Sequence, residues 1–453
     1  MAWRKASGAR QLERGQKNSR TNYGLSSRTK ISIFAVVIFA FGRPSDAFSI
    51  SGGPFSSQPS ARSTPRKTAH TPLVMMAKAK TKKAPATSTT KGFGSMPTSI
   101  GKKDLLIDAE YADFTQWLKN GGSIVGKVAF ANDLRGIKGL RGVVCGTQPI
   151  EAGDAIVTIP REMAITLGTE AKNSGHADQA KSAGFAGAEL ARIKNDPVRS
   201  KKWKPYIDIL PTGKSLDNAI FYPAEDLALT EWPLVITETQ ERVAMLRQTH
   251  ADLQAQLDPA NFGGGSSVSW EDFLWGVFQV ESRVFTIYEE VGFSGKKVGT
   301  KFAVPMIDMF NHDSASPHEL KCTKDGLFKV VAGRKILPGQ EINIVYGGGV
   351  LNNDRIFQDY GFVEVNNSED VKQVLMDKSD TATLHGASGL GLDAAGIRGV
   401  LASFSTSKEE DEALLAAASL SGFAATAIRF RMEKKKAMLR ALEVLESGVV
   451  KKQ

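Results

Sequence analysis

Two strings of residues in the second half of the chain decide its fold: Val304-Pro305-Met306-Ile307-Asp308-Met309-Phe310-Asn311-His312 and Gly339-Gln340-Glu341-Ile342-Asn343-Ile344-Val345-Tyr346-Gly347. The first string ends an apolar segment with an Asn-His pair, whose amide and imidazole groups can hydrogen-bond the edge of a purine. The second string predicts a strand over 341–346, in which alternation places Ile342, Ile344 and Tyr346 on one face. That face carries the phenol inward, where its hydroxyl needs a hydrogen-bond partner.

Two shorter strings carry groups that suit a ligand. Gly139-Leu140-Arg141-Gly142 is a turn bounded by glycines, which lets the backbone approach a ligand closely. Glu281-Ser282-Arg283-Val284-Phe285 lies within 273–287, where apolar and aromatic residues predict a helix. An arginine among Phe and Val needs an anionic partner. Each group also has a structural interpretation: a hairpin turn, a salt bridge for Arg283 and a backbone-bonded core tyrosine for Tyr346.

The rest of the pattern mixes strands and helices, and so predicts an α+β fold. Runs of β-branched residues between glycines predict strands, whereas apolar residues three and four apart predict helices. We expect strands within 124–166 and at 301–305, 327–333 and 341–346, and helices around 114–118, over most of 168–290 and from about 368 onward. In the last helix, 425–445, Ile428, Met432, Leu439, Leu442 and Leu445 form the apolar side. We interpret Lys434–Lys436 there as a solvated face.

The N-terminal arm has the composition of a targeting sequence. Residues 31–42 form a mostly apolar run of 12, shorter than the roughly 20 residues that span a bilayer. With the small residues of Ser45-Asp46-Ala47 after it, this run predicts a signal peptide over 1–47. Residues 48–100 contain no Asp or Glu and predict a transit-like disordered segment. A secreted or membrane-anchored protein with a basic linker is the alternative.

The order of these two segments resembles the two-part presequence of algae with secondary plastids, in which a Phe, here Phe48, follows the signal cleavage site. That resemblance implies import into the chloroplast stroma, with no stable membrane insertion after processing.

Composition excludes several classes of protein. Residues 1–103 hold 19 Lys and Arg against two acidic residues, whereas 104–453 hold 39 against 46. The body is therefore mildly acidic, which argues against a nucleic-acid binder. Two cysteines, Cys145 and Cys322, rule out a disulfide scaffold and a four-cysteine zinc site, and the scattered histidines predict no metal. We find no glycine-rich nucleotide loop and no nucleophile elbow.

In their order and spacing, the four strings resemble the SET-domain protein methyltransferases, and most closely the branch of the plastid Rubisco large-subunit lysine methyltransferase. Trp203-Lys204-Pro205-Tyr206 and Ile209-Leu210-Pro211 are similar to a string of the same branch. The resemblance covers about 104–453. It implies a SET-domain β core over 104–366 with a helical insertion at about 168–290, followed by an all-α substrate-binding domain over 367–453.

The resemblance also implies the chemistry. The methyl donor would be S-adenosylmethionine, and the acceptor a lysine of a plastid protein such as the Rubisco large subunit, aldolase or a ribosomal protein. Tyr346 would be the catalytic residue. Donor contacts would come from Gly139, Leu140, Arg141, Gly142, Arg283, Asp308, Asn311, His312 and Tyr346. The walls of the lysine channel would be Phe285, Tyr346 and Tyr360.

Two alternatives stay open beside a lysine methyltransferase. One branch of the family methylates histidine, and it carries a small polar residue at the position of Phe285; a phenylalanine there favours lysine. The other alternative is an inactive SET protein that binds a partner through its helical tail. Such a protein tends to lose Tyr346, Asn311 or Arg283, all of which this chain retains.

Overall fold

The computed structural model describes residues 109–171, 176–256, 267–291, 296–377, 389–417 and 420–447. The predicted signal peptide, 1–47, and transit-like segment, 48–100, lie outside these residues. Within the described ranges, no helix has both the length and the apolar character needed to cross a bilayer.

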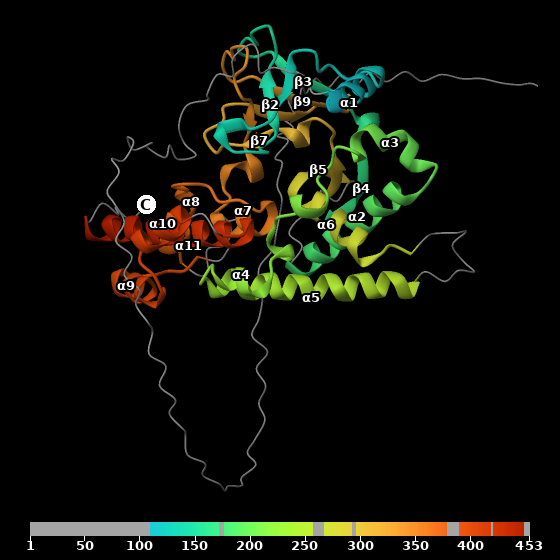
Figure 1. The fold of residues 1–453 in the computed structure, drawn as a ribbon. Helices are drawn as coiled ribbons and strands as arrows, with labels where there is room; N and C mark the ends of the chain where they lie inside the picture. Colours follow the sequence, from blue (N-terminus) through green and yellow to red (C-terminus); the bar gives the residue numbers. More distant parts are fainter. Residues whose placement is uncertain are drawn as a thin grey trace, which may run out of the picture. The chain divides into compact units, whose positions relative to one another are not determined.

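Short sheets form the β part of the molecule (Figure 1). The strands are β1 (Val128–Ala131), β2 (Gly142–Cys145), β3 (Ala155–Pro160), β4 (Ile165–Ala171), β5 (Val284–Val291), β6 (Lys296–Ala303), β7 (Asn311–His312), β8 (Glu319–Cys322), β9 (Leu327–Val331) and β10 (Asn343–Ile344). β1 pairs with β2, β3 with β9 and β9 with β8, and β4 with β6 and β6 with β5, all antiparallel, while β7 and β10 pair in parallel.

The helices occupy the start, the middle and the end of the described chain. They are α1 (Ala109–Asn120), α2 (His176–Asn195), α3 (Arg199–Ile207), α4 (Ala224–Ala228), α5 (Pro233–Gln256), α6 (Trp270–Arg283), α7 (Asn353–Tyr360), α8 (Ser368–Leu375), α9 (Ala394–Ser403), α10 (Lys408–Ala416) and α11 (Gly422–Glu446). This mixture of strands and helices confirms the predicted α+β class.

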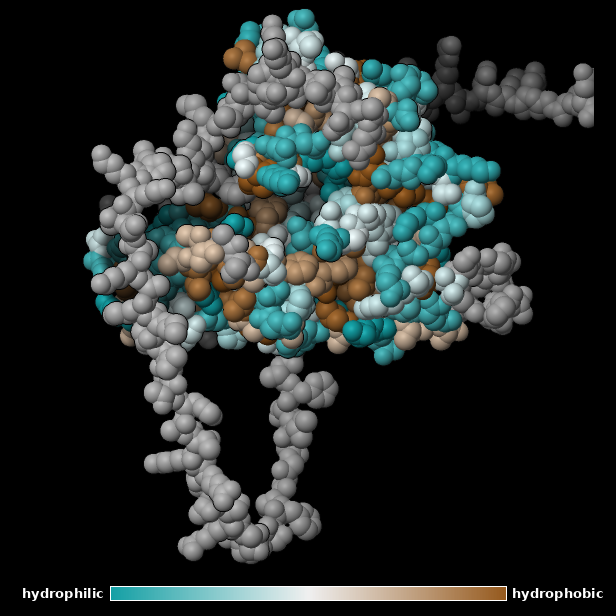
Figure 2. Space-filling model, viewed as in Figure 1, coloured by the Kyte–Doolittle hydropathy of each residue, from teal (hydrophilic) through white to brown (hydrophobic). Residues whose placement is uncertain are grey.

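Helix α2 packs against α5 and α6 (Figure 1). It can approach α6 closely because two glycines face each other: a Cβ atom on Gly276 would stand 2.1 Å from the Gly187 carbonyl oxygen. The main core then joins these helices to the sheets through large buried side chains such as Phe278, Phe302 and Phe328. On the face seen in Figure 2, hydrophilic areas alternate with separate hydrophobic ones.

The predicted helix over 273–287 is wrong beyond Arg283. Helix α6 begins after Ser269, whose side chain caps it by accepting from the Asp272 amide, and it ends at Arg283. The following residues are β-branched or aromatic and pair with β6 as strand β5, so sheet pairing outweighs the helical spacing. Arg283 is therefore the last residue of a helix. The helical insertion is likewise shorter than 168–290, because β4 extends to Ala171.

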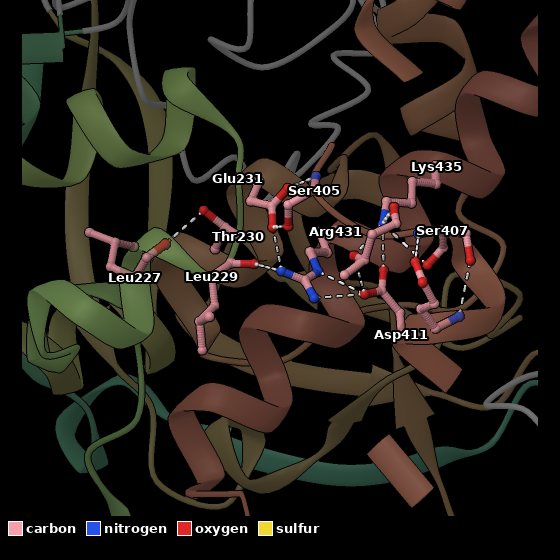
Figure 3. Close-up of polar contacts among 11 residues, drawn as sticks. Leu227, Leu229, Thr230, Glu231, Ser405, Ser407, Asp411, Arg431 and Lys435 are labelled. Carbon is pink, nitrogen blue, oxygen red and sulfur yellow. Dashed lines mark hydrogen bonds and ion pairs between the residues drawn. The ribbon is translucent and has the colours of Figure 1, made fainter. Parts of the chain in front are cut away.

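The interpretation of Lys434–Lys436 as a solvated face is wrong. Lys434 and Lys435 are 1% and 3% exposed. Lys434 pairs with acids of α7 and α8, and Lys435 pairs with Asp411 of α10. Figure 3 shows Arg431 and Lys435 of α11 both directed at Asp411. Leu439, expected on the apolar side, is 41% exposed. Helix α11 thus buries a charged face against the acids of its neighbours.

Candidate functional site

A cavity of about 650 Å³ brings together most of the predicted site residues. Its walls come from the turn before β2, from the 3₁₀ segment and strand at 307–312, from the end of α6 and from the segment at α7. Those of the predicted residues that line it are Gly139, Leu140, Arg141, Arg283, Asp308, Asn311, His312, Tyr346 and Tyr360. Gly142 and Phe285 are not among its lining residues; both lie buried in strands.

The turn before β2 is held by its own polar groups. Gly139 has φ +80° and donates its N–H to the Asp133 carboxylate at 2.6 Å. Arg135 reaches from this turn to β10, donating to both oxygens of Glu341 at 2.8 and 3.0 Å and to Asn343 at 3.0 Å. This bidentate contact with Glu341 fixes the turn against the strand that precedes Tyr346. No sequence motif pointed to Arg135.

Asn311 is fixed in the same network. Its amide nitrogen donates to the Arg141 carbonyl and to Glu341 Oε1, both at 3.0 Å. Gly142 makes room for this amide, because a Cβ atom at that position would stand 2.5 Å from Asn311 Nδ2. Gly142 thus lies behind the wall and supports it, where the sequence predicted a direct donor contact.

His312 links the Asn-His pair to Tyr346. Its Nδ1 accepts the backbone N–H of Tyr346 at 3.0 Å, so the neutral ring carries its proton on Nε2. That Nε2 lies 3.7 Å from Glu364. The ring centroids of His312 and Tyr346 are 5.0 Å apart. The parallel pairing of β7 with β10 therefore sets both the backbone and the rings of this corner.

Tyr346 leaves the strand earlier than predicted. β10 covers only Asn343–Ile344, and Tyr346 begins a 3₁₀ turn through glycines with positive φ. Its hydroxyl donates to the Phe310 carbonyl at 2.6 Å, and its ring lies 4.8 Å from that of Tyr360. Burial raises the pKa of Tyr346 to about 12, although the Arg283 charge opposes it, so the phenol keeps its proton at neutral pH.

Arg283 and Asp308 form the polar end of the cavity. Arg283 Nη1 donates to the Asp308 carbonyl oxygen at 2.9 Å and lies 3.8 Å from Oδ2 of its carboxylate. Tyr206, from the Trp-x-Pro-Tyr string, donates to that same Oδ2 at 2.8 Å. Burial raises the pKa of Asp308 to about 6, against the opposing effects of Arg283 and Tyr206.

Two buried atoms of this pair have no hydrogen-bond partner in the described part of the chain: Nε of Arg283 and Oδ1 of Asp308. Both residues line the cavity. A buried donor or acceptor without a partner is costly, so the described residues leave this polar end of the cavity incompletely satisfied.

Sequence reasoning missed several cavity residues. Phe278, Phe362 and Asp217 line the cavity beside Tyr360. Phe278 lies within 273–287, where the sequence predicts an apolar helix and assigns it no role at a site, and no role is predicted for Phe362. Burial raises the pKa of Asp217 to about 6. The sequence carries no signal for Asp217, because a single acidic residue in a loop looks the same whether it lies at a site or on the surface.

Two other residues, Cys145 and His318, are buried and do not line the cavity. Cys145 is a buried residue of β2, and burial raises the pKa of its thiol. His318 lies just before β8, is 8% exposed and accepts the Gly333 N–H at 3.2 Å, so its ring is buried and hydrogen-bonded. Among the described ranges, no cluster of three His, Cys, Asp or Glu is placed to hold a metal.

Comparison with known proteins shows what this part of the chain is similar to. Residues 141–347 match the family model of the SET domain. "N-lysine methyltransferase setd6" of Danio rerio is 25% identical over 253 residues, 51% of this chain and 54% of that protein. "Actin-histidine N-methyltransferase" of Mus musculus is 24% identical over 297 residues, 63% of this chain and 48% of that protein. The chain thus spans about half the length of the curated relatives it matches.

Solved structures share the fold. The SET domain of LSMT bound to lysine and AdoHcy superimposes with a TM-score of 0.53 at 16% identity, covering 76% of this chain and 92% of that one. Rubisco LSMT bound to AdoMet gives 0.52 at 16% identity, covering 75% and 92%. At this identity the likeness concerns the fold alone.

Proposed function

We propose that this chain, which carries a SET domain and shares the fold of the Rubisco LSMT structures, is an S-adenosylmethionine-dependent protein-lysine N-methyltransferase. The observation that carries the proposal is the meeting of Tyr346 with Arg283 and Asp308 in one cavity. The volume of about 650 Å³ lies within the usual range for a cofactor-sized ligand.

The charged residues at the polar end of the cavity fit the methyl donor. The amino-acid head of S-adenosylmethionine carries a carboxylate and an ammonium, which match the charges of Arg283 and Asp308 respectively. The Asn311–His312 backbone and side chains would receive the adenine, and the turn at Gly139–Arg141 would cover the donor. When bound, the donor supplies a methyl group on a positively charged sulfur.

The aromatic residues fit a lysine acceptor. Phe278, Tyr346, Tyr360 and Phe362 line one cavity, and such rings can enclose the apolar stem of a lysine and face its cation. Desolvation there lowers the pKa of the amine below its usual 10.4, and the neighbouring positive sulfur lowers it further. The amine can thus lose its proton without a dedicated base. Tyr346 would then orient the nitrogen in line with the methyl group.

Histidine remains the second candidate acceptor, because actin-histidine methyltransferases are among the relatives. Phe285 no longer discriminates between the two acceptors, since it lies in the core of strand β5 and does not line the cavity. The aromatic lining favours the long, cationic side chain of lysine.

The location and partners are also part of the proposal. The composition of 1–47 and 48–100 supports delivery to the plastid stroma. The helices of 367–453 would bind the acceptor protein, for which the Rubisco large subunit, aldolase and ribosomal proteins are candidates. Fusing residues 1–100 to a fluorescent protein in an alga with secondary plastids tests the location: fluorescence outside the plastid would contradict it.

Radiolabelled methyl transfer tests the activity. The full chain is incubated with labelled S-adenosylmethionine and pooled peptides that each contain a single lysine or a single histidine, with Tyr346→Phe alongside. Label on lysine peptides that is lost in the variant supports the proposal. Label on histidine peptides alone would replace it with the second candidate. Donor binding without transfer to peptides or to a cell extract would favour an inactive binding module.

A further inference from the structure

A buried ionic cluster lies behind the aromatic wall of the cavity. Arg242 of α5 is 1% exposed, and its Nη1 lies 2.7 Å from Asp359 of α7 and 3.5 Å from Glu281 of α6. The side chain of Asn218 donates to Glu281 at 2.9 Å and contacts the Asp359 carbonyl at 3.5 Å. Neither carboxylate is more than 2% exposed. One arginine therefore joins three separate segments of the chain.

Each partner in this cluster is the sequence neighbour of a residue that lines the cavity. Asn218 follows Asp217, Glu281 precedes Ser282 and Asp359 precedes Tyr360. The walls are also in tight contact: a Cβ atom on Gly361 would stand 2.5 Å from the Asp217 carbonyl oxygen. A shift of any member of the cluster must therefore move a wall of the cavity.

Charge complementarity specifies how α7 sits on α5. Glu238 and Arg242 are four residues apart on α5, and Arg355 and Asp359 are four apart on α7. Arg355 lies 3.5 Å from Glu238, and Arg242 lies 2.7 Å from Asp359. Each arginine therefore faces an acidic residue of the other helix. Sliding α7 by one turn would place like charges together in a buried interface, which is strongly unfavourable.

We infer that Arg242 is a positioning residue, which holds the Tyr360 wall at a fixed distance from the Ser282–Arg283 wall and so sets the width available to the acceptor. The inference rests on the proposed function in that the cavity receives an acceptor. Width at the acceptor nitrogen decides how many methyl groups fit there. Arg242 itself does not line the cavity, so it acts only through Asp359 and Glu281.

The chain offers a matched control in Arg431. This arginine is also buried and also pairs with two carboxylates, Asp411 at 2.7 Å and Glu231 at 2.6 Å (Figure 3). Neither partner lines the cavity, and neither is next to a lining residue. Arg431→Met and Arg242→Met thus each remove a buried arginine from two carboxylates, although Asp411 keeps Lys435 as a partner, and only the second change lies behind a cavity wall.

The experiment compares full-length wild type, Arg242→Met, Arg242→Lys and Arg431→Met, each corrected for its folded fraction. Hydrogen exchange at amides 359–362 reports the wall directly. The best peptide from the pooled assay gives KM, kcat and the ratio of mono-, di- and trimethylated product. We expect faster exchange at 359–362, an acceptor KM raised about tenfold and a changed product ratio in Arg242→Met alone. Arg242→Lys should recover part of each change.

Equal behaviour of Arg242→Met and Arg431→Met, with KM, product ratio and exchange at 359–362 unchanged per folded molecule, would overturn the inference and leave Arg242 a stabilising residue only. If wild type transfers no methyl group, the proposed function fails, while the exchange comparison still decides the position of the wall. If Arg242→Met does not fold, Asp359→Asn takes its place. That variant leaves one arginine with one glutamate, a balanced pair, and should change exchange and KM in the same direction.

Discussion

Gly142 and Asn311 are packed so closely that a single methyl group between them cannot be accommodated: a Cβ atom on Gly142 would stand 2.5 Å from Asn311 Nδ2. The amide it would displace makes two hydrogen bonds at 3.0 Å, one to the Arg141 carbonyl and one to Glu341. Through Glu341 the disturbance would reach Arg135 and the turn before β2. A glycine outside the cavity thus governs the corner where the donor's adenine is proposed to bind.

Gly142→Ala should therefore weaken the binding of S-adenosylhomocysteine about tenfold, since at least one hydrogen bond to a charged group is lost. Isothermal titration measures this directly. Gly126→Ala is the control, because a Cβ atom there meets nothing within 4 Å. Equal affinities of the two variants would show that Asn311 does not contribute to the site.

Tyr346→Phe should lower kcat about 10²- to 10³-fold, because it removes a fixed hydroxyl that donates to Phe310 at 2.6 Å beside the reacting atoms. The ring and its contact with Tyr360 remain, so S-adenosylhomocysteine affinity should stay within about threefold of wild type. Rates come from the labelled peptide assay. A kcat within about threefold of wild type would remove Tyr346 from the catalytic role.

The burial of Lys434 predicts how much its substitution lowers the free energy of unfolding. Its Nζ lies 2.7 Å from Asp354 and 2.6 Å from Asp370, and all three side chains are 1% exposed. Lys434→Met would leave two buried carboxylates unpaired, so the free energy of unfolding should fall by about 3–5 kcal/mol. Urea titration followed by circular dichroism measures it.

Lys436→Met is the control for that prediction and should cost clearly less. Lys436 is 24% exposed, and its partner Glu433 also accepts the Asn366 N–H at 2.8 Å. A smaller loss for Lys434 than for Lys436 would contradict the buried cluster.

His318 predicts a sensitivity to acid. Burial, reinforced by Arg334, lowers the pKa of His318 to about 4, whereas the unfolded chain takes up the proton near 6.5. The stability that the neutral ring contributes is therefore complete above about pH 6.5 and is lost as the pH falls toward 4. His318→Asn keeps an oxygen acceptor for the Gly333 N–H but does not titrate. Its urea midpoint should fall less than that of wild type between about pH 7 and about pH 5, and an equal fall would contradict the prediction.

The strands and the Asn-His corner could be predicted because their signals are local. β3 covers 155–160, inside the range 124–166 where strands are expected, since its β-branched run ends at Pro160. Helix α6 was overextended, because the periodicity of 284–287 fits a helix until pairing with β6 is known. The burial of Lys434 could not be predicted from α11 alone, because its partners Asp354 and Asp370 lie 80 and 64 residues earlier in the chain.

The residues of the candidate site also fall into those that the sequence predicts and those that it does not. Tyr346, Arg283 and Asp308 were found because their strings occur in a recognisable order, and the structure brings them together. Arg135 and Asp217 were missed, because a single charged residue in a loop carries no pattern. Phe285 was expected in the cavity on the strength of its position after Arg283, but the change from helix to strand at residue 284 turns its side chain into the core.

The pairing of β7 with β10 has a consequence for folding of the chain during its synthesis. Two strands that run in parallel cannot close as a hairpin, and here the connection between them contains β8 and β9. The corner that holds His312 beside Tyr346 therefore needs residues from both ends of this long connection, and Tyr360 lies further along the chain. A chain emerging from the ribosome would acquire donor affinity only once residues through Tyr346 are free to fold, so ligand capture by truncated nascent chains would report when this corner is complete.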